Sequence, residues 1–293
     1  MSAGPLTLLV DNGSLEPAAT LALRELAAQL ARRLGHPVEP VSLLHSSGID
    51  PALLDGRPAE ILFPALEKRV AAGQERLVIL PLFFGPSQAL TVYLPDNLAR
   101  LHKKFPGGEI RLAPPLHEAG DERLARALAD RVREELNAAT RGTDGPASKP
   151  AASRPVRVAL VDHGSPVAAV TAVRDDLARQ LPGLLGSEVV AVAPCSMERR
   201  PESAYDFNDP LLARLLATPP WSESEVVVAL QFLLPGRHAG PGGDVAEICR
   251  QAEALQPRLR TRLTAVLGSH PLMLEILADR WRSAWPFSVG GKA

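Results

Sequence analysis

The hydrophobic positions of the chain form short, continuous apolar runs that alternate with longer stretches of helical periodicity. Because apolar residues occupy consecutive positions within the runs, these are typical of parallel strands that are buried on both faces. We expect strands at residues 6–11, 38–43, 77–82 and 110–113 in the N-terminal half, and at 156–162, 188–193, 225–231 and 262–266 in the C-terminal half.

Helical stretches lie between these runs. The stretch at 19–35 ends at Gly35, which is a helix-stop signal, and the stretch at 168–183 ends at Pro182-Gly183. Strand–helix alternation with short connections predicts an α/β fold. Each half should be a doubly wound, flavodoxin-like parallel sheet of about four strands.

The two halves repeat one another. "LVDNGSL" at 9–15 matches "LVDHGSP" at 160–166 with an offset of 151 residues, and "LVILPLFFGPSQA" at 77–89 matches "VVALQFLLPGRHA" at 227–239 with an offset of 150. "LADR" occurs at 128–131 and again at 277–280, an offset of 149. Three matches in the same order with nearly constant spacing indicate an internal duplication.

A segment of different composition separates the halves. Residues 137–155, "NAATRGTDGPASKPAASRP", are rich in small and turn-forming residues and lack large apolar side chains, which is typical of a flexible linker. We therefore expect a first domain at 1–136, a linker at 137–153 and a second domain at 154–293.

Composition excludes several classes of protein. The chain has 293 residues, of which 46% are hydrophobic and 22% charged, as in globular proteins. Its net charge of −1 gives no basic excess for binding nucleic acid. No apolar stretch approaches the roughly 18 residues that span a bilayer, and no signal peptide is visible. Cys195 and Cys249 have no CxxC spacing, so we expect reduced thiols in a cytoplasmic protein.

Candidate chemistry follows the expected strands of the C-terminal half, because doubly wound sheets bind ligands beyond the carboxyl ends of their strands. These loops carry "DHGS" at 162–165, "PCS" at 194–196, "PGRHAGPGGD" at 235–244 and "GSH" at 268–270. Imidazole binds metals and exchanges protons near neutral pH. His163 and His238, converging from neighbouring strand ends, would form an open metal site.

Other readings of these loops stay open. A single histidine at a strand end is more often a hydrogen-bonded structural residue than a catalyst, and His270, which precedes Pro271 at a helix start, fits that reading. Ser165 is expected to cap a helix, because no serine-centred elbow motif is present. Phosphate-loop, dinucleotide-binding and HExxH motifs are absent, and we interpret "GPGGD" at 240–244 as a loop over the site. The role of Asp244 is left open.

Three segments in combination resemble the sirohydrochlorin chelatases of the CbiX type, which are class II chelatases. They are "LVDHGSP" at 160–166, "LQFLLPGRHAGPGGDVAEI" at 230–248 and "LTAVLGSHPLMLEILADR" at 263–280. The resemblance implies two chelatase-like halves fused in one chain, with a tetrapyrrole held in the cleft. It also implies that His163 and His238 bind the metal and take part in proton removal. The metal is then a substrate, Co²⁺ or Fe²⁺, and no cofactor is permanently bound.

The N-terminal half has Asn12 and Gln88 where the C-terminal half has the two histidines. Amides do not act as general bases near neutral pH and are poorer metal ligands than imidazole. We therefore expect that the N-terminal half has lost the metal and contributes Asn12 and Gln88 to substrate binding as a wall of the cleft. Since the fused halves complete one cleft, we expect a monomer.

Sirohydrochlorin is rich in carboxylates, which guanidinium groups bind well. Arg237, Arg199 and Arg200 are candidates for this role, together with Ser165, although the arginines also fit a reading as solvated surface residues. The function expected is insertion of cobalt or iron into sirohydrochlorin, in cobalamin or siroheme biosynthesis. The alternatives are a non-catalytic tetrapyrrole- or metal-binding protein, and a related enzyme for another tetrapyrrole or for nickel. The sequence does not determine the metal or the pathway.

Overall fold

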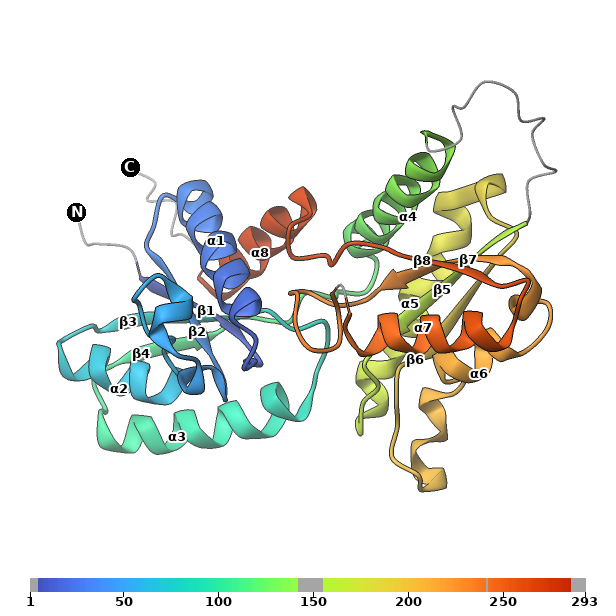
Figure 1. Cartoon of the computed structure of the whole chain (residues 1–293). Helices are drawn as coiled ribbons and strands as arrows, with labels where there is room; N and C mark the ends of the chain where they lie inside the picture. Colours follow the sequence, from blue (N-terminus) through green and yellow to red (C-terminus); the bar gives the residue numbers. More distant parts are fainter. Residues whose placement is uncertain (1–4, 142–154, 241, 286–293) are drawn as a thin grey trace. The chain divides into compact units, whose positions relative to one another are not determined.

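Two parallel four-stranded sheets form the framework of the described chain, which comprises residues 5–141, 155–240 and 242–285 of a computed structural model (Figure 1). The first sheet has the order β2-β1-β3-β4 and the second the order β6-β5-β7-β8. The predicted duplicated, doubly wound α/β architecture is confirmed. The strands are β1 (Leu6–Asp11), β2 (Val38–Ser42), β3 (Arg76–Pro81), β4 (Glu109–Leu112), β5 (Val156–Asp162), β6 (Ala191–Ser196), β7 (Glu225–Leu230) and β8 (Arg260–Leu263).

Helices cover both faces of each sheet. The α-helices are α1 (Pro17–Leu34), α2 (Leu62–Ala71), α3 (Leu94–Lys104), α4 (Arg123–Arg141), α5 (Ala168–Leu185), α6 (Leu212–Ala217), α7 (Asp244–Leu255) and α8 (Pro271–Ala284). Short helical turns are η1 (Ser46–Gly48), η2 (Pro51–Leu54), η3 (Ala89–Tyr93), η4 (Gly186–Glu188), η5 (Ser203–Asn208) and η6 (Trp221–Glu223). In the first sheet α1 and α8 pack on one face and α2 and α3 on the other, and in the second α4 and α5 oppose α6 and α7 (Figure 1). None of the described helices is long and apolar enough to cross a bilayer.

The compact units do not coincide with the sequence repeats. Unit 1 comprises residues 1–119 and 268–293, and unit 2 comprises residues 120–267. The last helix of each repeat packs on the sheet of the other repeat: the Trp281 indole N–H on α8 donates to the hydroxyl of Thr7 on β1, at 2.7 Å. The expected domains at 1–136 and 154–293 therefore describe the repeats, whereas the packing exchanges their closing helices.

The expected linker lies partly inside a helix. Residues 137–141, predicted to begin the linker, form the last turn of α4, and the remaining positions at 142–153 lie outside the described residues. Alanine and arginine at these positions favour helix, so the small-residue composition indicated the linker too early.

Other boundaries differ from the prediction by up to three residues, and two of them have a clear physical reason. The strand expected at 188–193 runs from Ala191 to Ser196, because Pro194 is tolerated on β6, an edge strand of its sheet. The "PCS" triplet therefore belongs to the strand and not to the loop, and Cys195 is fully buried. Helix α5 continues through Pro182 to Leu185, since a proline in the last turn removes only one intrahelical hydrogen bond.

Candidate functional site

The winding of the second sheet reverses at its central strand. The chain runs from β5 to β6 on one side and then returns to β7 on the other side of β5. At such a reversal the connections diverge, which is where open α/β sheets bind ligands. His163 directly follows β5 and His238 lies in the loop after β7, so both histidines stand at this reversal. Their rings meet edge to face, with 4.7 Å between the centroids and 72° between the ring planes.

The backbone of the next residue orients the His163 imidazole. Nδ1 of His163 lies 3.1 Å from the carbonyl oxygen of Gly164, and because a carbonyl only accepts, Nδ1 is the donor in this contact. The other nitrogen, Nε2, lies 3.5 Å from a carboxylate oxygen of Glu198. The His163 side chain is 46% exposed, so a ligand can approach Nε2 while the ring is held from its other side.

A carboxylate orients the second imidazole. Nδ1 of His238 lies 2.6 Å from Oδ2 of Asp244, the first residue of α7. The loop folds back so that the backbone N–H groups of Asp244 and Val245 donate to the carbonyl oxygens of Arg237 and His238. Glycine is needed at position 243, because a Cβ there would lie 2.9 Å from the Arg237 oxygen. Because the carboxylate occupies Nδ1, Nε2 is the nitrogen left to bind a metal, an arrangement common among metal-binding histidines.

Glu198 is a candidate that the sequence reasoning missed. It stands two residues beyond the end of β6, and its backbone N–H donates to the carbonyl oxygen of His163, which joins the two strand-end loops. The sequence argument selected its neighbours Arg199 and Arg200 for their charge. Position gave no signal for Glu198, because the strand was expected to end at 193, five residues before it, and not at Ser196.

His163, His238 and Glu198 together present two imidazoles and one carboxylate. In the described part of the chain, no three histidine, cysteine, aspartate or glutamate side chains are close enough to hold a metal ion jointly. The geometry is therefore an open two-imidazole site with a carboxylate beside one ring. Imidazole accepts iron, cobalt, nickel and zinc, and it also exchanges protons near neutral pH.

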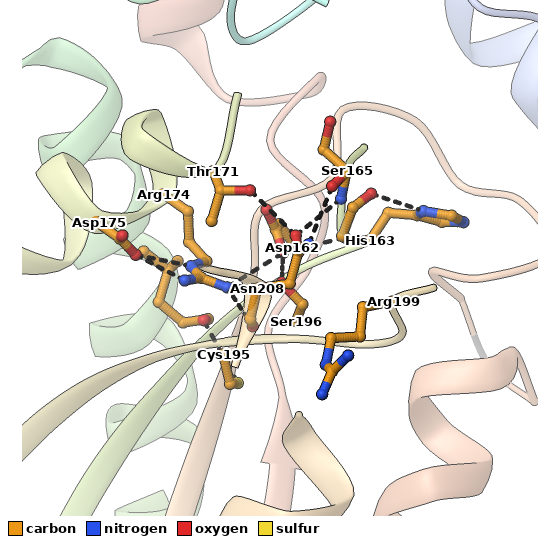
Figure 2. Close-up of polar contacts among 12 residues, drawn as sticks. Asp162, His163, Ser165, Thr171, Arg174, Asp175, Cys195, Ser196, Arg199 and Asn208 are labelled. Atoms are coloured by element: carbon orange, nitrogen blue, oxygen red, sulfur yellow. Dashed lines mark hydrogen bonds and ion pairs between the residues drawn. The ribbon is translucent and has the colours of Figure 1, made fainter. Parts of the chain in front are cut away.

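A buried polar network lies beneath the His163 loop, as Figure 2 shows. Oδ1 of Asp162 accepts from the Ser196 hydroxyl at 2.5 Å, and Ser196 Oγ in turn accepts from Arg174 at 2.6 Å. Burial raises the pKa of Asp162, while the Ser196 hydrogen bond and the Arg174 charge act in the opposite direction. The side chains of this network are part of the packed interior.

The predicted substrate-binding residues of unit 2 differ in how they are engaged. Arg199 is held between two carboxylates, at 3.1 Å from Asp209 and 2.9 Å from Asp206, and its side chain is 17% exposed. Arg200 is exposed and donates to the hydroxyl of Tyr205 at 3.0 Å.

Arg237 lies beside the second histidine and is 77% exposed, with its Nε 3.5 Å from Oδ2 of Asp244. The hydroxyl of Ser165 accepts from the backbone N–H of Val167 at 3.0 Å, so it supports the turn into α5. Arg200 and Arg237 are therefore the more accessible cations of the predicted set.

Unit 1 has the same strand-end positions without the imidazoles. Asn12 directly follows β1, as His163 follows β5. The backbone N–H of Leu44 donates to the Asn12 carbonyl oxygen, as that of Glu198 donates to His163, so Leu44 occupies the place of the carboxylate. Unit 1 thus lacks both groups that face each other in unit 2.

The equivalence of Gln88 and His238 changes in the structure. The strands β3 and β7 align with an offset of 149 residues, from their registers against β1 and β5, rather than the 150 used for the loop. If the offset of 149 residues continues into the loop, Ala89 is the counterpart of His238. The match with Gln88 requires that the alignment shift by one residue after the strand. Neither residue carries an imidazole, so the loss of the second histidine from unit 1 holds in both registers.

His270, the remaining strand-end histidine, belongs to unit 1 and has a structural role. Its Nδ1 accepts from the backbone N–H of Leu272 at 3.2 Å, which caps the start of α8, and the residue is 7% exposed. A cavity of about 740 Å³ also lies in unit 1, between α1 and β2. Two of the three arginines that line it bind protein groups: Arg24 donates to backbone carbonyls, and Arg69 pairs with Glu39 and Glu60.

The chain matches one family model twice. The model is described as CbiX, and it matches residues 6–135 and 157–284, which are the two sequence repeats. A comparison with curated proteins found no match.

Solved structures with the same fold span nearly the whole chain. SirB from Bacillus subtilis with Fe³⁺ has a TM-score of 0.65 at 16% identity and covers 96% of this chain and 95% of that one. The sirohydrochlorin chelatase SirB from Bacillus subtilis subspecies spizizenii, in complex with cobalt, has a TM-score of 0.66 at 17% identity and the same coverage. CbiX, described as the terminal enzyme for biosynthesis of siroheme in denitrifying bacteria, has a TM-score of 0.55 at 16% identity, covering 96% of this chain and 99% of that one. At these identities the likeness is one of fold.

Proposed function

The chain belongs to the CbiX family, and from the geometry of its histidine pair we propose that it is a sirohydrochlorin chelatase, which inserts a divalent metal ion into the tetrapyrrole. The observation that carries the proposal is the edge-to-face pair of His163 and His238, 4.7 Å apart at the reversal of the sheet. Each ring is anchored through Nδ1, by the Gly164 carbonyl or the Asp244 carboxylate, so the two Nε2 atoms remain for the substrates.

An incomplete donor set suits a metal that must leave the protein. A closed site of four protein ligands retains its ion, whereas two imidazoles leave positions open for the pyrrole nitrogens. Glu198, at 3.5 Å from Nε2 of His163, supplies an anionic oxygen beside the pair. We assign to it an electrostatic role, the attraction of the incoming cation toward His163, because the three side chains do not form a joint site.

Metal insertion also releases two pyrrole protons. A neutral imidazole accepts a proton near neutral pH, which makes His163 and His238 suitable bases as well as ligands. In this reading Asp244 stabilises the imidazolium that forms on His238, since the two groups are 2.6 Å apart. His163 has an uncharged carbonyl in the same position, so we propose His238 as the principal proton acceptor.

The substrate carboxylates require cations near this edge. Arg237 and Arg200 are exposed and lie on loops beyond β7 and β6, so we propose them as carboxylate-binding residues. Arg199, held by two aspartates, would act mainly by fixing its loop. We propose substrate contacts for Ser165 in unit 2, and for Asn12 and Gln88 in unit 1, in a chain that works as a monomer.

The test is metallation of sirohydrochlorin by Co²⁺ or Fe²⁺, followed by absorbance. We expect rates well above the spontaneous reaction, lost in His163→Ala/His238→Ala and retained in His102→Ala, which removes an exposed imidazole on α3. The metal that gives the larger kcat/KM identifies cobalt or iron as the substrate. Activity that survives in the double variant would refute the assignment of the site.

The second candidate is a non-catalytic tetrapyrrole- or metal-binding protein. The loss of both histidines and of the carboxylate from unit 1 favours it, because this fold evidently persists without the chemistry. Tight binding of sirohydrochlorin without acceleration by either metal would support this candidate and exclude the enzyme.

A further inference from the structure

A charged side chain is buried under the His163 loop. Arg174 lies on α5 and is 1% exposed, and it is the only arginine or lysine besides Arg280 among the buried residues of the described chain. Burying a guanidinium costs several kcal/mol unless its donors are satisfied. Its Nε and one terminal nitrogen donate to Oδ1 of Asp175 on the same helix, at 2.9 and 2.8 Å. The other terminal nitrogen points toward the strand ends (Figure 2).

One arm of the network joins Arg174 to the residue that precedes His163. Arg174 donates to the Ser196 hydroxyl at 2.6 Å, and that hydroxyl donates to Oδ1 of Asp162 at 2.5 Å. The same carboxylate oxygen accepts the backbone N–H of Gly164 at 3.1 Å. The peptide bond between His163 and Gly164 is thereby held by a chain of hydrogen bonds that ends at the Arg174 guanidinium.

The second arm reaches the loop through Asn208. Arg174 donates to the Asn208 carbonyl oxygen at 2.9 Å, which holds the end of η5. The Asn208 amide then binds both sides of one residue: its oxygen accepts from the Ser165 backbone N–H at 2.9 Å, and its nitrogen donates to the Ser165 carbonyl at 3.0 Å. Asp162, Gly164 and Ser165 surround His163 in sequence, and all three are held by groups that Arg174 binds.

The other half of the chain shows that the loop itself does not need the arginine. Helices α1 and α5 have equal length and align with an offset of 151 residues, which places Leu23 at the position of Arg174. Leu23 is 1% exposed and simply fills the interior. In unit 1 the Ser14 backbone N–H is bound by the Ser46 hydroxyl instead. In unit 1, where the loop carries Asn12, the turn forms with Leu23 beneath it. In unit 2, where the loop carries His163, the equivalent position is Arg174.

We propose that Arg174 is a positioning residue for His163, which sets the direction of the imidazole through Ser196, Asp162 and Asn208. The inference rests on the proposed function for its catalytic consequence, though not for its geometry. The Gly164 carbonyl holds Nδ1 of His163, and the Gly164 N–H is held by Asp162. Release of that peptide turns the ring and moves Nε2, and displacements of about 1 Å can cost about 100-fold in rate.

The test uses Arg174→Leu, which copies unit 1, together with Arg174→Lys and a control, Arg179→Leu. Arg179 is on the same helix, but its side chain is 71% exposed and pairs with Asp176 at the surface. Co²⁺ alone is titrated into each full-length protein, and the visible absorption reports the geometry and affinity of the histidine site. Sirohydrochlorin metallation gives kcat and KM, and thermal unfolding gives stability.

We expect Arg174→Leu to weaken Co²⁺ binding about tenfold or more and to lower kcat by about 10- to 100-fold, with the KM for sirohydrochlorin unchanged. Arg174→Lys should recover part of the loss, since an ammonium still donates to Ser196, and Arg179→Leu should match the wild type. A wild-type cobalt spectrum, affinity and kcat in Arg174→Leu, with only a lower Tm, would overturn the proposal.

Asn208→Ala is the second variant, because it frees Ser165 without leaving a buried charge and so decides the matter if Arg174→Leu does not fold. Weakened Co²⁺ binding in Asn208→Ala supports the positioning network, and unchanged binding refutes it. If the wild type fails to metallate sirohydrochlorin, the proposed enzyme function falls, while the cobalt titrations still decide the role of Arg174.

Discussion

The loops that follow the central strands of the two sheets share a backbone and differ in chemistry. Each has an aspartate at the strand end and a glycine two residues later with positive φ, +90° at Gly13 and +93° at Gly164. A Cβ on Gly13 would meet the Leu44 carbonyl oxygen at 1.7 Å, and one on Gly164 would meet that of Glu198 at 2.0 Å. This close approach requires glycine in both loops, so the turn is a property of the fold and not of the site.

The side chains around the turn changed together. Where unit 2 has a histidine, a carboxylate and a buried arginine, unit 1 has Asn12, Leu44 and Leu23. Asp11 and Ser42 remain of the polar set, at the positions of Asp162 and Ser196, and Oδ1 of Asp11 is buried without a hydrogen-bond partner among the described residues. The buried arginine is therefore present only in the unit whose loop carries the histidine. The glycine and the aspartate are present in both units, together with the shared backbone conformation.

The largest effect should come from making unit 2 copy unit 1. His163→Asn/His238→Gln keeps polar side chains at both positions but removes the two bases, so metallation should fall by about 100-fold or more. The measurement is kcat/KM for sirohydrochlorin with Co²⁺ or Fe²⁺. The reverse exchange in unit 1, Asn12→His/Gln88→His, should give no gain, because no carboxylate or arginine supports those positions. Full activity in the first variant would show that the two loops do not differ in function.

The next effect concerns stability and differs in size between the two units. Burial raises the pKa of Asp11 from 3.8 to about 6, and hydrogen bonds from Ser42 and Gly13 only partly oppose it. The folded state thus holds this proton more tightly than the unfolded state, so stability is full below about pH 4, falls between about pH 4 and 6, and stays reduced above. Asp11→Asn should then stabilise the protein at pH 8 by about 3 kcal/mol, but not at pH 4.

Asp162→Asn is the matched variant for that test. Burial raises the pKa of Asp162 as well, but the Ser196 hydrogen bond and the charge of Arg174, 3.8 Å away, oppose the rise, so Asp162→Asn should stabilise the protein at pH 8 by less than Asp11→Asn does. The measurement is Tm at pH 4 and pH 8 for both variants, where about 3 kcal/mol corresponds to roughly 6–12 °C. Equal shifts in the two variants would contradict the account of the two networks.

The third effect tests the anchor of the second histidine. Asp244→Asn keeps the shape but removes the charge beside Nδ1 of His238, so Co²⁺ affinity and kcat should each fall by about 10- to 100-fold. Glu247→Gln, one turn further along the same helix and bound to Arg250 at the surface, is the control and should have no effect. A wild-type affinity in Asp244→Asn would mean that the carboxylate only closes the loop.

Much of the fold and part of the site were predictable from the sequence, and the reasons differ by residue. Continuous apolar runs fixed the strands to within three residues, and the order of elements predicted both sheets. The histidine pair was predictable because His163 and His238 follow strands that parallel winding brings together.

The remainder depends on contacts that no local pattern records. The exchange of α4 and α8 between the sheets results from tertiary packing, such as the Trp281–Thr7 hydrogen bond between residues far apart in sequence. Glu198 was missed because its relation to His163 is a backbone pairing between two loops. Arg174 looks like an ordinary helical arginine until its burial is known.

The smallest effect expected is at the carboxylate. Glu198→Leu gives unit 2 the residue that unit 1 has at Leu44, and it removes a carboxylate that lies 3.5 Å from His163 but does not complete a joint site with both rings. Co²⁺ affinity should therefore fall only about three- to tenfold, less than for loss of either imidazole, because imidazole remains the principal ligand. Glu198→Gln separates charge from volume and should give most of the same loss. A decrease as large as that of the double histidine variant would make Glu198 an equal ligand, and the difference between the two loops would then be a full three-donor site against none.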